Sequence, residues 1–209
     1  MERFSTIYSD RLGSIQTEII VNGTQLILIV EGVKFAANSF DGFKTLDLSN
    51  KNSRFTFNNE QELTNCQIIS KIPLILIKNF QEIQSTLEIK LSLNSSSDNN
   101  GIFSLEFENV KIITKPVFDF ESGLEFIKME LPHDYKLKCC FGCAFSDYSV
   151  YGNGFFGSML CFRNIKEQYL MVKDKDEYLN IMDNSDSLVQ ETYLCDEFLS
   201  RPMKIGYRG

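Results

Sequence analysis

The chain has 209 residues and a net charge of −7, with 43% hydrophobic residues and only four prolines. This composition is typical of a folded globular protein and excludes a disordered chain. The evenly spread acidic charge argues against nucleic acid as a partner. No apolar stretch approaches the roughly 18 residues that a membrane helix needs, and the amino terminus has no secretory pattern. We therefore expect a cytoplasmic protein that binds neither nucleic acid nor membranes.

Alternating apolar and polar residues predict β-strands through most of the chain before the cysteine-rich segment. Residues 15–21 and 25–30 flank Asn22-Gly23, a pair that favours a tight hairpin turn. A second hairpin is predicted from residues 87–93 and 103–107, whose apolar side chains alternate with polar ones.

The last strand of this part is expected at Ile127, Met129 and Leu131, which are spaced two residues apart. With few helical patterns, the chain fits a mainly β fold, a β-sandwich of roughly seven to nine strands. A turn at Pro132-His133-Asp134 suggests a boundary, which gives a sandwich domain over residues 1–134. Residues 135–209 are expected to form a Cys-rich α+β module packed on that domain, or to continue it as one domain. In this module, residues 175–182 have helical periodicity after a suitable N-cap, Asp174.

Four of the six cysteines could bind one metal ion. Cys140 and Cys143 are separated by the two-residue gap that lets both thiolates reach a single tetrahedral ion. Cys161 and Cys195 would complete a four-thiolate zinc site. Two alternatives remain open: plain reduced core thiols, or a redox or catalytic role.

Strand alternation through residues 136–140 separates the two adjacent cysteines. It places Cys139 on the core side, and Cys140 on the face of Lys136 and Lys138. These two lysines would favour the thiolate at Cys140. Cys66 is expected to be an isolated buried thiol.

Charged and aromatic residues accompany the cysteines. Arg163 is expected to form a buried salt bridge with Glu191 or Asp147, because polar groups packed in a core must be paired. The alternative is a partner-binding surface, since Tyr and Arg are frequent at binding hot spots; its residues would be Tyr148, Tyr151, Tyr193, Tyr207 and Arg208.

Four motifs near the carboxyl terminus resemble an uncharacterised bacterial family that is known only as a domain of unknown function. They are C-F-G-C-A-F-S-D-Y-S-V-Y-G from Cys140, C-F-R-N from Cys161, E-T-Y-L-C ending at Cys195, and the terminal G-Y-R-G. The resemblance implies a link to toxin–immunity loci, in which a protein neutralises a toxin by binding it. It implies no active site.

These observations favour a non-enzymatic cytoplasmic protein-binding domain, which could be an immunity-type protein with a structural cysteine cluster. Two alternatives remain: a thiol-dependent or redox enzyme that uses Cys140 or Cys143, and a metal or redox sensor. The single histidine, His133, lies beside a proline in a turn, which gives little support to a Cys-His catalytic pair.

Overall fold

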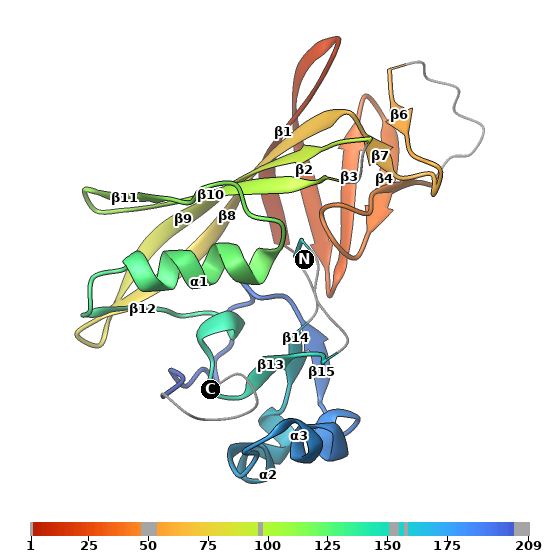
Figure 1. Ribbon diagram of the computed structural model, residues 1–209. Coiled ribbons are helices and arrows are strands. Elements are labelled where there is room, and N and C mark those ends of the chain that lie inside the picture. The colour runs from red at the N-terminus through yellow and green to blue at the C-terminus, as the bar shows by residue number, and fades with distance from the viewer. Residues whose placement is uncertain (1, 47–53, 96–97, 151–154, 157–158, 203–209) are drawn as a thin grey trace.

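The computed structural model describes residues 2–46, 54–95, 98–150, 155–156 and 159–202 (Figure 1). It confirms a mainly β fold. Hydrogen bonds join ten strands into one antiparallel sheet, with nine of them in the order β11-β10-β9-β8-β1-β2-β3-β4-β5 and β12 added beside β8. The expected two-sheet sandwich is not confirmed, because all the described strands of this part except the short β6 and β7 are connected as one continuous sheet.

The strands of the main sheet are β1 (Glu2–Asp10), β2 (Gly13–Asn22), β3 (Gln25–Val30), β4 (Val33–Ala37), β5 (Lys44–Thr45), β8 (Cys66–Lys78), β9 (Gln81–Leu93), β10 (Asn100–Phe107), β11 (Val110–Ile113) and β12 (Tyr135–Leu137). A separate pair consists of β6 (Thr56–Phe57) and β7 (Leu63–Thr64). The long strands β8 and β9 pair along their whole length and connect the two halves of the sheet.

Both predicted hairpins are present. The turn between β2 and β3 lies one residue later than predicted, at Gly23 and Thr24, because Asn22 still pairs with Gln25. Gly23 has φ +60, a left-handed conformation that glycine adopts readily. Strands β9 and β10 pair in register, and their buried residues alternate with more exposed ones along β9. Local alternation and turn chemistry are therefore enough to locate these strands.

The strand expected at Ile127, Met129 and Leu131 is wrong, because this segment belongs to helix α1 (Phe120–Glu130). The helix begins at Asp119, whose side chain accepts a hydrogen bond from the backbone N–H of Ser122 at 2.7 Å. Its buried residues have helical spacing, and Met129 points away from the core with 79% of its surface exposed. Figure 1 shows α1 lying across the part of the sheet that contains β8 to β11.

After α1, β12 pairs with β8, so the main sheet continues past residue 134. The remaining elements are a short 3-10 helix η1 (Cys140–Gly142), a second one η2 (Arg163–Ile165), helices α2 (Lys166–Leu170) and α3 (Lys175–Met182), and a three-stranded sheet of β13 (Ser146–Tyr148), β14 (Met159–Cys161) and β15 (Ser187–Val189). Helix α3 has the predicted bounds, and Asp174 caps it by accepting from the Glu177 N–H at 2.9 Å.

The main core is formed by apolar side chains of the large sheet, α1 and η1. A second cluster lies under α2 and α3, where the Phe162 and Tyr169 rings stack with centroids 4.6 Å apart. Among the described residues, no helix is long and apolar enough to cross a membrane.

Candidate functional site

Three segments that are distant in sequence meet at the predicted cysteine cluster. The backbone N–H of Cys140 donates to the Tyr193 carbonyl at 3.0 Å, which brings the Cys195 segment to η1. Ser146 pairs with Cys161 across β13 and β14, and its hydroxyl donates to the Cys140 carbonyl. The structure therefore gathers the neighbourhoods of all four predicted ligands.

The structure does not support the expected activation of Cys140. Burial raises the pKa of Cys140 well above its usual range, and the neighbouring thiols of Cys143, Cys139, Cys161 and Cys195 raise it further. Cys139 and Cys140 are both buried, because the chain leaves the extended conformation at η1, and strand alternation no longer separates their side chains. The prediction that Cys140 shares a face with Lys136 and Lys138 is therefore wrong.

Metal binding by these thiols stays a prediction. Over the ranges that the structure describes, no three Cys, His, Asp or Glu side chains are arranged so that they could hold one metal ion. The thiols lie near enough to raise one another's pKa. Burial is the largest cause of the raised pKa of Cys161, Arg163 lowers that pKa, and Cys143 and Cys195 raise it. A four-thiolate zinc site would require further movement of these side chains.

A buried polar network lies beside the thiols. Tyr169 donates to Asp147 Oδ2 at 2.7 Å, and the Arg201 guanidinium donates to the same phenol oxygen at 2.9 Å. Tyr148 donates to Glu191 Oε1 at 3.1 Å. The side chains of Asp147 and Glu191 are fully buried, so these contacts compensate for the cost of removing their charges from water.

The partner of Arg163 differs from both expectations. Arg163 forms an ion pair with Asp186, with Nη2 and Oδ2 2.6 Å apart, on a partly exposed surface. The arginine closest to Asp147 is Arg201, at 3.9 Å and with little exposure. The sequence pattern identified a paired arginine correctly but not its partner.

The predicted Tyr/Arg surface is only partly described. Tyr148 is buried, whereas 40% of the Tyr193 surface is exposed. Tyr151, Tyr207 and Arg208 lie outside the described residues.

A surface feature that sequence reasoning missed lies at the tip of the β8–β9 hairpin. Asn79 and Phe80 form its two-residue turn, with φ of +48 and +67. This conformation favours Asn-Gly and is strained for a residue with a bulky side chain. Phe80 is nevertheless fully exposed to solvent.

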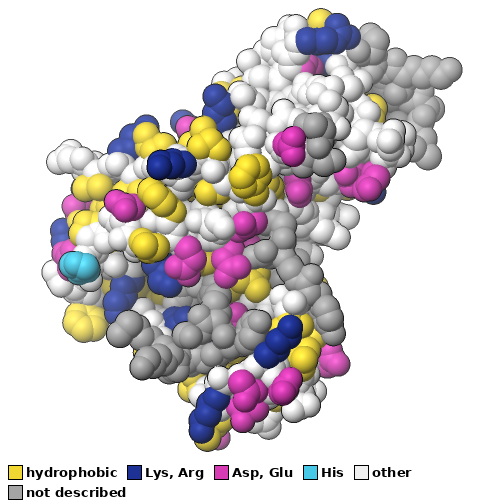
Figure 2. Space-filling view, viewed as in Figure 1, with side chains coloured by type: hydrophobic (Ala, Val, Ile, Leu, Met, Phe, Trp, Pro, Cys, Tyr) yellow, Lys and Arg dark blue, Asp and Glu magenta, His cyan; other side chains and the backbone are white. Residues whose placement is uncertain are grey.

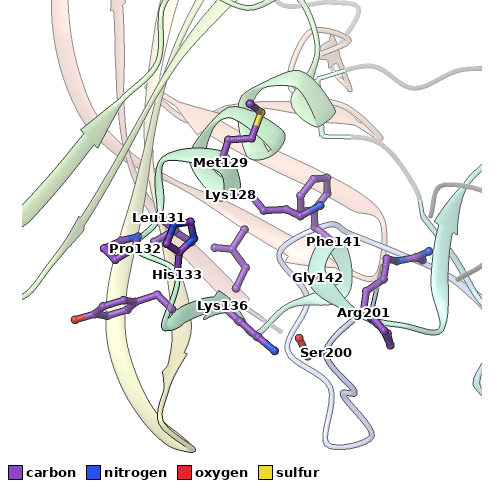
Figure 3. Close-up of a pocket in the computed structure, with 13 residues that line it drawn as sticks. Lys128, Met129, Leu131, Pro132, His133, Lys136, Phe141, Gly142, Ser200 and Arg201 are labelled. Carbon is purple, nitrogen blue, oxygen red and sulfur yellow. The ribbon is translucent and has the colours of Figure 1, made fainter. Parts of the chain in front are cut away.

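A cleft of about 730 Å³ opens between the end of α1, β12, η1 and residues 200–202 (Figure 3). Leu131, Leu137 and Phe141 provide buried apolar surface in its wall. Lys128 and Lys136 supply positive charge, and none of the described residues that line the cleft is an Asp or a Glu.

The comparisons with known proteins identify a family. A model described as a family of unknown function, DUF6304, matches residues 2–146. The chain belongs to the DUF6304 family. No curated protein and no solved structure matches it significantly.

The DUF6304 match covers the β-rich part of the chain and ends inside the C-F-G-C-A-F-S-D-Y motif. The motifs at Cys161, Cys195 and the terminal G-Y-R-G lie beyond this match, which therefore does not test them. The match also runs across residue 134, as does the hydrogen bonding of the main sheet. The hairpin tip of this DUF6304 protein could have been suspected from sequence, because Asn79-Phe80 separates an apolar run, residues 72–77, from the alternating run that leads into residues 87–93.

Proposed function

We propose that this protein recognises another protein and carries out no chemistry of its own. The observation that carries the proposal is Phe80, a strained aromatic residue whose side chain is fully exposed at a hairpin tip. Backbone strain of this kind costs about 1–3 kcal/mol and is often found at functional sites. Aromatic side chains are enriched in protein–protein interfaces.

Other apolar residues of the described chain are also exposed. Those on β11, on α1 and in the segment between them are Val110, Ile113, Phe118 and Met129. Figure 2 shows hydrophobic side chains interspersed with charged ones over the face that contains α1. Apolar groups surrounded by polar ones are typical of interaction surfaces.

The groups that could perform catalysis are used within the fold. Cys140 is buried with a raised pKa, which disfavours the nucleophilic thiolate. Asp147 and Glu191 are buried and hydrogen-bonded to tyrosines. These contacts support a structural role for the cysteine cluster and its polar neighbours, with zinc as the ion that four thiolates would bind.

The proposed partner is a basic protein, because the net charge of −7 would attract one. The toxin–immunity resemblance of the carboxyl-terminal motifs makes a toxin a candidate. A cytoplasmic location belongs to the same proposal.

The test compares three tagged forms of the protein as baits in extracts of the native cells: the original chain, Phe80→Gly and Leu12→Ser. Leu12 is the matched control, because it is an exposed apolar residue in a different hairpin. We expect quantitative mass spectrometry to find a protein captured by the original chain and by Leu12→Ser but lost with Phe80→Gly.

Glycine suits the conformation at position 80, so Phe80→Gly should remain folded, and loss of capture would report the missing side chain. Equal capture by all three baits would contradict the proposal. Rapid turnover of a substrate by the purified chain would also contradict it.

A further inference from the structure

The cleft between α1, β12 and η1 has a chemistry that the protein-binding proposal does not use. Its volume of about 730 Å³ is within the usual range for small-molecule sites, roughly 300–1,000 Å³. Such sites combine mainly apolar walls with a few polar groups that orient the ligand. The cleft has both.

Backbone contacts hold the walls of the cleft in place. The backbone N–H of Arg201 donates to the Gly142 carbonyl at 2.9 Å, and that of Ala144 donates to the Leu199 carbonyl at 2.7 Å. These bonds fasten residues 199–201 against η1. A Cβ atom at Gly142 would overlap the carbonyl oxygen of Leu137, so glycine permits η1 to pack directly on β12.

The charge in the cleft is local and positive. None of the ion pairs between described residues involves Lys136, and in Figure 3 its side chain extends toward Ser200. Lys128 forms an ion pair with Glu125, with Nζ and Oε1 3.1 Å apart, and its ammonium lies 5.9 Å from the centre of the Phe141 ring. The Arg201 guanidinium is directed out of the cleft, where it donates to the carbonyls of Cys143 and Ser146.

This lining contrasts with the charge of the whole molecule. A chain with net charge −7 repels anions in general, yet here two lysines lie beside buried Leu131, Leu137 and Phe141, and no acidic residue is among the described lining residues. His133 lines the same cleft. The surroundings therefore favour a negative group attached to an apolar body.

We propose that this cleft binds a small amphipathic organic anion, with its apolar body against Leu131, Leu137 and Phe141 and its negative group beside Lys136. The class includes aliphatic and aromatic monocarboxylates. The ammonium group of Lys136 acts as a point charge, so a carboxylate or a sulfonate can satisfy it. This site is separate from Phe80, and either proposal can fail without the other.

The test is a fluorescence titration of the full chain with two probes. The anionic probe is 8-anilinonaphthalene-1-sulfonate, and the uncharged one is N-phenyl-1-naphthylamine. We expect saturable binding of the sulfonate at one site, and competition by octanoate but not by octan-1-ol.

Lys136→Glu should weaken sulfonate binding roughly tenfold, because reversing a partly exposed charge changes the attraction by about twice the value of one surface pair. The affinity for the uncharged probe should change less than twofold.

Lys90→Glu is the matched control, since Lys90 is an exposed lysine on β9 that does not line the cleft. It makes the same change in net charge and should leave sulfonate binding unchanged. Circular dichroism and thermal unfolding check that each variant is folded, so that probe binding to unfolded protein is not mistaken for binding in the cleft. Equal affinity in Lys136→Glu and the original chain would overturn the proposal, as would equal weakening by Lys90→Glu or failure of octanoate to compete. If an acidic peptide competes and octanoate does not, the cleft is a protein-binding groove and the small-molecule proposal is wrong.

Discussion

The phenol of Tyr169 donates a hydrogen bond to the carboxylate of Asp147, with 2.7 Å between the two oxygens and both side chains fully buried. This bond connects α2 to β13. Arg201 donates to the same phenol oxygen, so one tyrosine links the small sheet, a helix and the segment that follows β15. A buried carboxylate depends on such donors to remain charged in the core.

Removing the Tyr169 hydroxyl should therefore destabilise the protein. We expect Tyr169→Phe to lower the free energy of unfolding by about 2 kcal/mol, since it removes a donor from a buried charged group. Urea unfolding measures the change. Tyr193→Phe is the control, because Tyr193 is exposed and its change should stay within about 0.5 kcal/mol. Equal effects of the two variants would contradict the proposed importance of the network.

Phe80→Gly should have the opposite effect on stability. The left-handed conformation at position 80 is unfavourable for phenylalanine and acceptable for glycine. We expect the free energy of unfolding to rise by about 1 kcal/mol, which urea or thermal unfolding can measure. Together with loss of partner capture, this gain would show that Phe80 is retained for binding at the expense of stability. A less stable Phe80→Gly variant would instead indicate that the ring supports the fold.

Stability should fall in mildly alkaline solution. Burial raises the pKa of Cys66 to about 12, and burial also raises the pKa values of Cys140 and Cys161. Above the ordinary thiol pKa of about 8.5, the unfolded chain loses these protons while the folded chain retains them. The folded state is then disfavoured as pH rises, by up to about 1.4 kcal/mol per pH unit for each buried thiol. Below pH 8.5 both states keep the protons, and the contribution to stability is complete.

Urea unfolding at several values between pH 7 and pH 10 measures this dependence. Cys66→Ala should make the decline shallower, because one buried thiol no longer titrates. An unchanged slope in Cys66→Ala would show that Cys66 ionises equally in both states.

The thiols should react with iodoacetamide in an order set by burial. Cys195 is partly exposed and should be modified first in the folded protein at neutral pH, whereas buried Cys140 should be among the slowest. Peptide mass spectrometry over time measures the order, and all six cysteines should react in denaturant. Rapid selective modification of Cys140 would instead support the thiol-enzyme alternative.

The zinc hypothesis makes a separate prediction. Binding by Cys140, Cys143, Cys161 and Cys195 would give one equivalent of zinc in freshly purified protein, with the metal lost in Cys143→Ser and Cys195→Ser. Cys66→Ser is the control and should retain it, since Cys66 lies on β8 in the main sheet. Metal analysis by mass spectrometry measures the content. Zinc-free protein of full stability would show that the four cysteines are structural thiols.

Several elements could be predicted because their signals are local. The β2–β3 hairpin follows from Asn22-Gly23 between alternating runs, and α3 follows from Asp174 and the spacing of its apolar residues. The segment around Ile127 and Leu131 was ambiguous, because residues four apart fit both a strand and a helix. The N-cap at Asp119 and the exposure of Met129 show that this segment is a helix. The exposure of Met129 is evident only in the tertiary structure, in which α1 packs on the sheet.

The amino-acid sequence by itself determined a mainly β chain, the β2–β3 and β9–β10 hairpins and the helix after Asp174, because turn preferences, capping and periodicity act between near neighbours. Tertiary structure decided that Cys140 is buried, that Arg163 pairs with Asp186, and that Phe80 extends into solvent beyond the sheet. Burial and ion pairing depend on which distant segments pack together. The distances between such segments are set only by the complete fold.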